Sequence, residues 1–387
     1  MIILKCPEIR FKNDDGNNYP NWEDKKLDNV FKFYKGKGIS KIELSEEGIP
    51  CIIYGELYTK YREVIGVVKS KTNIKKELLF MSEIGDILIP SSGETQKDIA
   101  TASTVMEKNV ALGGDINILR SKETINSPYV SYYLKHIKNI EISKLSQGNS
   151  VVHLYSKQLS NLKIEIPSLE EQQKIGDFFT LLDKRIEQQE QKIALLKDYK
   201  KAMMQKIFSQ KIRFKDDNGN DYPDWEEKKL GKICRVKSSQ LTNNVVEEIG
   251  KYPVYGANSI VGYTENYEVN KYVSIVKDGA GVGRIAFINN KSSVLGTLQY
   301  LIGIEITTEF LYVLLSNVNF KLYQTGTTIP HIYFKDYSKM IIDIPCQLEQ
   351  EKISSFLFAM DLNLENQEAI LNNLKEQKQG LLRKMFV

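Results

Sequence analysis

The segment Pro223–Lys228, which reads PDWEEK, carries the acidic and basic groups that a metal-dependent nuclease uses. In such enzymes carboxylate oxygens hold a divalent cation, which activates a water molecule for attack on a phosphate. Only one residue separates Asp224 from Glu226, whereas the nuclease pattern needs the two carboxylates on separate strand elements. A near copy of this phrase earlier in the chain has Asn21 in place of Asp224. The segment is therefore not expected to be a nuclease centre.

A second candidate is DGAGVGR, residues 278–284, which resembles a glycine-rich phosphate loop. It lacks the GxGxxG spacing, and the IAFI that follows predicts a strand, not a helix whose N-terminus could hold a phosphate. A tight turn is the favoured interpretation; in the functional alternative Arg284 contacts a nucleic-acid phosphate. His153 and His331 stand at equivalent places in VVHLY and IPHIY, which favours a repeated hydrogen-bonding role over catalysis.

The remaining sequence gives no sign of catalysis or of a metal site. It contains no GxxxxGK[ST], GxSxG, HExxH or [ND]PP[YFW] motif. Its three histidines are dispersed, and none of its four cysteines forms a CxxC pair (Cys6, Cys51, Cys234 and Cys346). No run reaches the roughly 18 apolar residues of a membrane helix, and the first residues do not read as a signal peptide. We therefore expect a non-catalytic, cytoplasmic protein without a metal or cofactor of its own.

Composition indicates an ordinary globular chain that can accept a polyanion. Hydrophobic residues make up 42% of the 387 residues and charged residues 26%. A net charge of +4 from 53 basic and 49 acidic residues permits a nucleic-acid partner without requiring one. The length predicts two or three domains.

The chain repeats itself in two places. Residues 9–27 and 212–230 agree at 14 of 19 positions, at an offset of 203. Residues 148–167 and 326–345 agree at 8 of 20 positions, at an offset of 178, and this similarity continues without a gap to the end of each copy. The chain therefore consists of two units, about 9–208 and 212–387, that share their ends and differ in the middle.

Each shared end predicts a long helix with a heptad seam of apolar residues. Ser168 and Glu171 form a plausible capping box at its start in the first copy, where the second copy has Cys346. Both copies interrupt the seam at equivalent places, Gln189/Gln367 and Lys200/Lys378. The predicted seam residues are Ile175, Phe179, Leu182, Ile186, Ile193, Leu196, Ile353, Leu357, Met360, Leu364, Leu371 and Leu374.

Charge predicts how the two helices pair. Residues 170–190 hold six acids and three bases, and residues 191–208 hold one acid and five bases. The second helix repeats this gradient, so an antiparallel coiled coil sets acidic halves against basic halves. Part of the gradient simply complements each helix dipole. In the alternative, each helix packs only on its own domain.

The middles differ in sequence but predict the same mixed α/β order of strands followed by a helix. Strands are expected over residues 41–58, 85–92, 251–267, 271–288 and 298–304, and helices over 127–137 and 308–323, the second capped at Thr308. Their loops are rich in amide, hydroxyl and lysine side chains, which read base edges and contact phosphates. The candidate DNA contacts are Ser91, Ser92, Glu94, Thr95, Gln96, Lys97, Asn149, Ser150, Asn258, Lys277, Arg284, Thr297, Gln299, Thr327 and Thr328.

These residues together resemble the specificity subunits of type I restriction–modification enzymes. The resemblance rests on paired phrases: NWEDKKLDNV and DWEEKKLGKI, GNSVVHLYSKQL and GTTIPHIYFKDY, IEIPSLEEQQKI and IDIPCQLEQEKI. It covers essentially the whole chain. The chain departs from the pattern in its short lead before the first phrase and in Cys346, where a proline or small residue is common.

The resemblance implies two β-rich target recognition domains, residues 1–160 and 212–338, joined by spacer helices within 161–211 and 339–387. The helices would form an antiparallel coiled coil with internal pseudo-two-fold symmetry and set the gap of an asymmetric two-part DNA target. Two modification subunits would methylate adenine N6 from S-adenosylmethionine, and two restriction subunits would use ATP and Mg²⁺. A protein- or carbohydrate-binding scaffold is the alternative function, and an autonomous enzyme a third.

Overall fold

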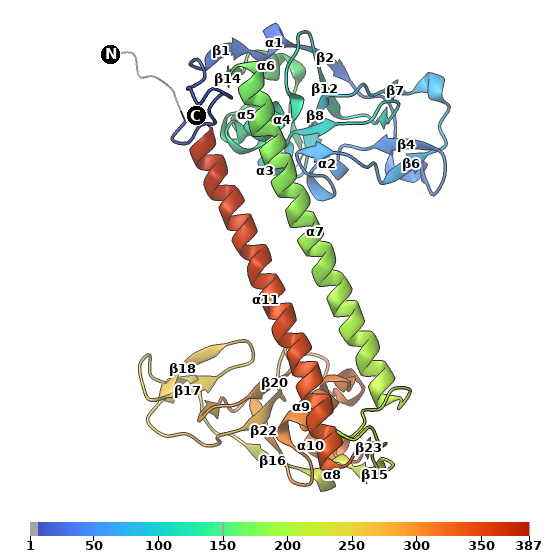
Figure 1. Ribbon diagram of the computed structural model, residues 1–387, viewed down its shortest axis with the longest axis vertical. Helices are drawn as coiled ribbons and strands as arrows, with labels where there is room; N and C mark the ends of the chain where they lie inside the picture. Colours follow the sequence, from blue (N-terminus) through green and yellow to red (C-terminus); the bar gives the residue numbers. More distant parts are fainter. Residues whose placement is uncertain (1–6, 149–150, 387) are drawn as a thin grey trace. The chain divides into compact units, whose positions relative to one another are not determined.

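The computed structural model describes residues 7–148 and 151–386, which form two compact units. Unit 1 contains the described residues up to Gln191 together with those from Ala369 onward, and unit 2 is Lys192–Glu368. Each unit combines several small sheets with short helices and with segments of two long helices, which confirms the predicted mixed α/β class (Figure 1). The predicted boundaries after residues 160, 211 and 338 follow the sequence repeats and stay predictions.

The described residues of unit 1 form two five-stranded sheets and two strand pairs. The first sheet has the order β2 (Phe31–Lys35), β12 (Ile116–Ser121), β8 (Asp86–Pro90), β10 (Ser103–Val105), β5 (Val64–Ile65). The second has the order β3 (Leu44–Ser45), β6 (Ser70–Thr72), β4 (Ile49–Ile52), β11 (Ala111–Leu112), β7 (Phe80–Met81). The pairs are β1 (Glu23–Lys26) with β14 (Lys163–Ile166) and β9 (Ser92–Gly93) with β13 (Val152–His153).

In the described part of unit 1 the short α-helices are α1 (Leu27–Val30), α2 (Glu56–Thr59), α3 (Gln96–Ile99), α4 (Ser127–His136), α5 (Asn139–Leu145) and α6 (Ser156–Ser160). Helix α4 begins as its sequence predicts, because Pro128 lies in the first turn and the Asn126 side chain accepts the Tyr129 N–H at 2.8 Å. Its buried tyrosines join the main core of the unit.

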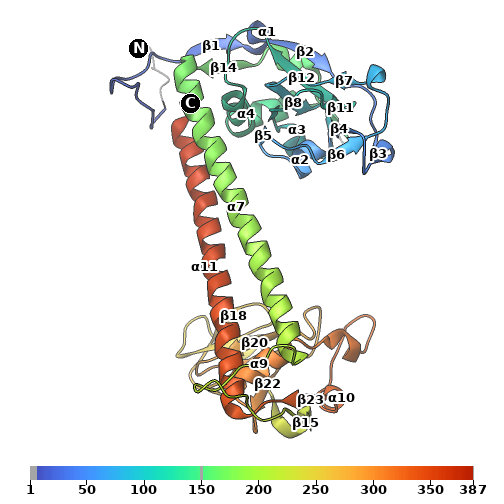
Figure 2. The same ribbon diagram turned by 45° about the vertical axis from the view of Figure 1, so that its right-hand side comes forward.

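Unit 2 repeats this plan with fewer strands (Figure 2). Its larger sheet has the order β16 (Cys234–Ser238), β22 (Leu298–Gly303), β19 (Tyr272–Val276), β20 (Ile285–Ile288). A smaller sheet has the order β18 (Ile260–Thr264), β17 (Tyr252–Tyr255), β21 (Ser293–Val294), and β15 (Glu226–Lys229) pairs with β23 (Ile341–Ile344). The short helices are α8 (Leu230–Ile233), α9 (Thr308–Ser316) and α10 (Phe334–Tyr337).

The helix predicted over residues 308–323 is shorter than expected. Helix α9 ends at Ser316, and a separate 3-10 turn, Phe320–Tyr323, begins after Asn319, whose side chain accepts the Lys321 N–H at 3.2 Å. The prediction of Thr308 as the cap is also wrong, because Thr307 Oγ1 accepts the Phe310 N–H at 3.1 Å. Asparagine side chains compete for backbone N–H groups, which explains the break.

Two long helices, α7 (Leu169–Phe208) and α11 (Gln347–Met385), contribute to both units. In unit 1, α7 residues 183 and 190 pair with α11 residues 378 and 375. In unit 2, α7 residues 197 and 200 pair with α11 residues 368 and 361. In each unit the residue number of the α11 partner falls as the residue number along α7 rises. The two helix segments are therefore antiparallel in each unit, as predicted. The alternative of separate packing is wrong, because Leu382, Met385 and Phe386 lie in the core of unit 1.

The structure buries most of the predicted seam. Fully buried members are Ile175, Phe179, Ile186, Ile193, Ile353, Leu357 and Leu374, and half-buried members are Leu182, Leu196, Met360, Leu364 and Leu371. The Ser168 hydroxyl accepts the Glu171 N–H at 3.4 Å, which supplies one half of the predicted capping box. The Glu171 carboxylate has a different role, described next.

The repeated segments, residues 9–27 and 212–230, attach each domain to its long helix. Arg213 donates to Glu349 of α11 at 2.7 and 3.3 Å, and the Trp225 indole N–H donates to the same carboxylate at 3.0 Å. Arg10, Trp22 and Glu171 repeat this arrangement in unit 1. Both glutamate side chains are fully buried. The pairing with Glu349 raises the pKa of Arg213.

Removing one of these carboxylates is expected to destabilise its unit. Glu349→Ala removes the carboxylate that accepts from the Trp225 indole and from Arg213. Arg213 keeps its bonds to the Tyr222 and Pro223 carbonyls. Because Arg213 is 20% exposed, the cost should be about 1–3 kcal/mol. Thermal unfolding of the full chain measures the effect. Glu351→Ala, at an exposed position of the same helix, is the matched control and should change stability little. Equal effects of the two variants would contradict a fastening role.

Candidate nucleic-acid interface

In unit 2 three loops meet at the end of strand β19. The Lys277 N–H donates to Thr297 O at 2.9 Å, which joins the loop after β19 to the loop before β22. The Gly279 N–H donates to Pro330 O at 2.9 Å, which joins it to the turn 325–331. The predicted contact residues Lys277, Thr297, Thr327 and Thr328 are therefore brought into one cluster. Thr297, Thr327 and Thr328 are exposed there.

His331 joins this cluster through a side-chain contact with Asp278. His331 Nδ1 lies 2.7 Å from Asp278 Oδ1, and Lys277 contacts the same carboxylate. Burial alone would raise the pKa of Asp278, but the hydrogen bonds from His331 and Lys277 outweigh it and lower the pKa. The His331 backbone also exchanges two hydrogen bonds with Thr325, at 2.8 and 2.9 Å. Asp278 and His331 therefore hold the turn that carries the exposed threonines.

The remaining candidates of unit 2 make other contacts. Arg284 and Asn258 contact each other and line a cavity of about 330 Å³. The residues 278–284 form turns between β19 and β20, as the favoured interpretation of DGAGVGR predicts. Gln299 donates to Ser238 at 3.0 Å, while its Oε1 atom is buried with no hydrogen-bond partner. An acceptor in such a position is costly unless something satisfies it.

In unit 1 the equivalent histidine, His153, also makes a side-chain hydrogen bond, but with a different partner. Strand β9 pairs with β13, and Ser92 Oγ lies 3.1 Å from His153 Nδ1. Ser91 and Ser92 are each only 5% exposed, so their side chains lie beneath the surface and offer little area for direct contact. The candidates Asn149 and Ser150 lie outside the described residues. The predicted hydrogen-bonding role of His153 and His331 is confirmed in both units.

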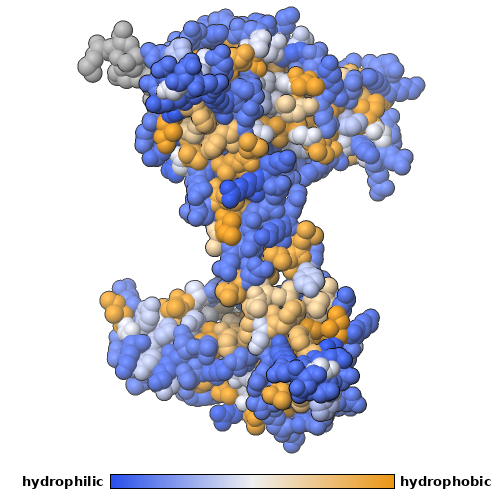
Figure 3. Space-filling view, viewed as in Figure 1, coloured by the Kyte–Doolittle hydropathy of each residue, from blue (hydrophilic) through white to orange (hydrophobic). Residues whose placement is uncertain are grey.

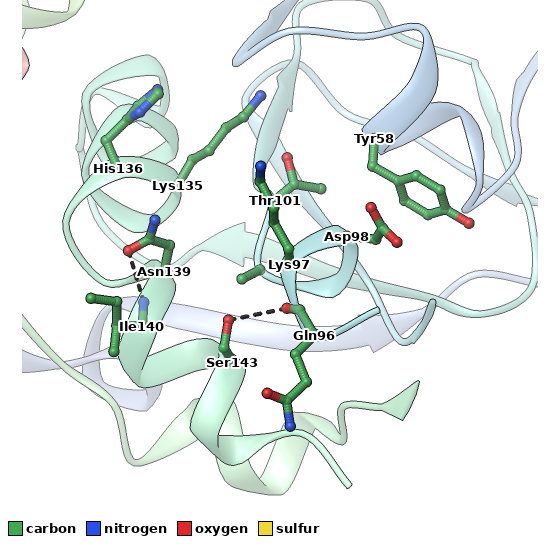
Figure 4. Close-up of a pocket in the computed structure, with 11 residues that line it drawn as sticks. Tyr58, Gln96, Lys97, Asp98, Thr101, Lys135, His136, Asn139, Ile140 and Ser143 are labelled. Atoms are coloured by element: carbon green, nitrogen blue, oxygen red, sulfur yellow. Dashed lines mark hydrogen bonds between the residues drawn. The ribbon is translucent and has the colours of Figure 1, made fainter. Parts of the chain in front are cut away.

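The exposed part of the polar run lies on α3. Thr95 caps this helix, because its hydroxyl accepts the Asp98 N–H at 3.2 Å. Glu94 is exposed beside it. Gln96 and Lys97 line a cavity of about 540 Å³ that lies between α3 and helices α4 and α5 (Figure 4). Ser143 of α5 closes one side by donating to Gln96 O at 3.0 Å, and Lys135 and His136 of α4 add basic groups to the wall.

The sequence candidates missed Asp278 and His331, which shape the unit 2 cluster. Their signal was present, since a histidine recurs at the same place in both copies. The hydrogen-bond partner of each histidine could not be predicted from the sequence. Residues 278 and 331 are far apart in the chain, and in unit 1 the partner of His153 is Ser92, not an aspartate.

Metal ligation, membrane spanning and cysteine reactivity are three further properties of the described residues. Among residues 7–148 and 151–386, no group of three or more potential ligands could hold a metal ion. In the same described part of the chain, no helix is long and apolar enough to cross a membrane. Burial raises the pKa of the Cys51 thiol to about 11 and that of Cys234 to about 12, so neither is a ready nucleophile.

Comparison with known proteins follows the duplicated architecture. A family model described as "Type I restriction modification DNA specificity domain" matches residues 19–198 and again 222–376. The type I restriction enzyme MjaVIII specificity subunit of Methanocaldococcus jannaschii is 24% identical over 426 residues, covering 99% of this chain and 96% of that protein. A putative type I specificity subunit of Mycoplasma genitalium is also 24% identical, covering 96% and 95%.

Solved structures support the fold. A crystal structure of a type I restriction–modification S subunit from M. genitalium superimposes with a TM-score of 0.69 at 20% identity, covering 99% of both chains. A chain from a study of complex assembly and conformational transition in the type I R-M system gives a TM-score of 0.54 at 17% identity, covering 95% and 98%.

Proposed function

The chain belongs to the family of type I restriction–modification DNA specificity domains, and we propose that it directs such a complex to an asymmetric, two-part DNA target. The observation that carries this proposal is that the family match occurs twice, over two units that share a scaffold and differ in their loops. Different loops on a common scaffold suit the reading of two different half-sites.

In this function each unit reads one half-site with its own loops. The turn 325–331 with Lys277 and Arg284 would face the DNA in unit 2, and the α3 loop would do so in unit 1. Lysine and arginine would neutralise phosphates, while amides and hydroxyls would read base edges. Affinity is therefore expected to fall steeply with salt.

Catalysis would reside on partners. Two modification subunits would methylate adenine N6 from S-adenosylmethionine after extruding the base, and two restriction subunits would use ATP and Mg²⁺. The outer helix faces offer docking area, since Leu181 and Ile370 in unit 1 and Leu195, Tyr199 and Leu362 in unit 2 are exposed. Figure 3 shows apolar patches among the mostly hydrophilic surface of the face in view.

A methylome tests the function. The chain is expressed with its modification subunit in a methylation-free host, and N6-methyladenine is mapped by long-read sequencing. One gapped, asymmetric motif methylated on both strands is the expected result. A soluble complex that produces no new motif would contradict the proposal.

Arg284→Ala tests the phosphate role assigned to that residue. The variant complex should bind target and unrelated DNA more weakly to a similar degree, and its salt slope should fall by about one. Binding titrations at several salt concentrations measure both quantities. Arg235→Ala removes the same charge from β16 and serves as the control. A loss confined to the target sequence would indicate base reading instead.

A further inference from the structure

The lysines that interrupt the two heptad seams each meet an aspartate of the opposite helix. Lys378 of α11 donates to Asp183 of α7 at 2.6 and 2.8 Å in unit 1. Lys200 of α7 pairs with Asp361 of α11 in unit 2. The two pairs are copies of each other, because both members recur at the sequence offset of 178. The two lysines that interrupt the seams therefore form the same ion pair, once in each unit.

The unit 1 pair is much less exposed than its neighbours, and the unit 2 pair is moderately less exposed. The side chains of Lys378 and Asp183 are 11% and 10% exposed, and those of Lys200 and Asp361 are 22% and 31% exposed. Shielding from water strengthens an ion pair and also makes an unpaired charge costly. By contrast, Lys197–Glu368 is about half exposed, and such surface pairs contribute little.

Alternative pairings of the helices would leave these charges unmatched. In a parallel, in-register pair, equivalent positions face each other, so Asp183 would meet Asp361 and Lys200 would meet Lys378. An antiparallel shift by one heptad would bring Asp183 against Leu371 or Met385. Apolar seam residues tolerate such shifts, whereas one buried polar group specifies register in coiled coils.

In unit 1 the recognition domain also binds this pair. Glu63 accepts from Lys378 at 3.2 Å and also contacts His136. The Tyr132 hydroxyl donates to Asp183 at 2.6 Å. Burial acts to raise the pKa of Glu63, but the His136 hydrogen bond and the charges of Lys135 and Lys378 outweigh it and lower the pKa. The pair therefore fixes the domain, α7 and α11 at one point.

We propose that Asp183–Lys378 and Lys200–Asp361 specify the antiparallel register of α7 and α11 and are therefore specificity-determining residues for the gap between the half-sites. This inference rests on the proposed function, in which the helices set that gap. The apolar seam supplies most of the helix affinity, and the two pairs select one register among those that the seam would accept.

The test replaces the pairs without opening a void. The Lys200→Leu/Asp361→Leu double variant makes the unit 2 seam apolar, and a fourfold variant adds Asp183→Leu and Lys378→Leu. Lys200→Asp/Asp361→Lys reverses one pair and preserves the match. Lys197→Leu/Glu368→Leu removes the neighbouring exposed pair and is the control. Each full chain is expressed with the modification subunit, and the gap of every methylated site is mapped alongside the thermal midpoint.

The fourfold variant is expected to raise the fraction of sites with a different gap by about tenfold, equivalent to about 1.4 kcal/mol of lost discrimination. The thermal midpoint of the double variant should not fall, because apolar replacements of ion pairs are often neutral or stabilising. The fourfold variant should be less stable, because it also takes their partners from the Tyr132 hydroxyl and the Glu63 carboxylate. The reversed pair and the control should keep the single gap. If the fourfold variant does not fold, the double variant is judged by the same criterion.

An unchanged gap distribution in the apolar variants overturns the inference while the proposed function stands. Broadening by the reversed pair equal to that of the double variant also overturns it, because the match of charges is then irrelevant. Failure of the wild-type chain to direct any gapped methylation is a different result and counts against the proposed function itself.

Discussion

Exchanging residues 31–145 for the same segment of another specificity subunit is expected to replace one half-site and to leave the other half-site and the gap unchanged. The exchange runs from the first residue of β2 to the last residue of α5. It keeps the β1–β14 pair and the Arg10–Glu171 contact, which fasten the domain to α7. Each mismatched base pair costs about 1–3 kcal/mol, so methylation of the original sites should fall by about 100-fold or more.

The equivalent exchange in unit 2 is the matched control. Residues 234–331 run from the start of β16 to the end of the turn 325–331, which is the turn proposed to face the DNA. This exchange should replace the other half-site and leave the first. The methylomes of the two chimeras measure both outcomes. If either chimera alters both half-sites, the two units do not read DNA independently.

Inserting four residues after Gln191 and four after Ala369 is expected to lengthen the gap and keep both half-sites. These are equivalent positions of the two helices and lie at the limits of the compact units. Four helical residues add about 6 Å, close to two base pairs of DNA. The recognition loops and the Lys–Asp pairs lie outside the inserted segments, so base reading should persist.

Insertion of seven residues at the same positions distinguishes length from helix phase. Seven residues preserve the heptad, whereas four produce a local change of supercoil. The gap should grow by about three base pairs with seven residues. An insertion into one helix only should lower methylation sharply, because the two seams no longer match. If the gap length stayed the same after both paired insertions, the helices would not set the gap.

The sequence by itself determined the duplicated plan of this protein. The two offsets marked the shared ends, and the heptad periodicity marked α7 and α11. The charge gradient predicted antiparallel pairing, which the structure bears out in each unit. These features are readable because periodicity and charge order act along one segment, without knowledge of any distant partner. Helix ends were less readable: local hydrogen bonds by Asn319 and Thr307 overrode the apolar pattern around α9.

Only the tertiary structure decided which polar residues meet. It buried Ser91 and Ser92, joined Asp278 to His331, and gave the seam lysines Lys200 and Lys378 their aspartate partners. In the sequence those lysines were merely interruptions of an apolar stripe. A buried charge is tolerated where an opposite charge reaches it, and that reach depends on the packing of elements far apart in the chain. The scaffold can therefore be predicted from local patterns, whereas the polar contacts named here depend on long-range packing.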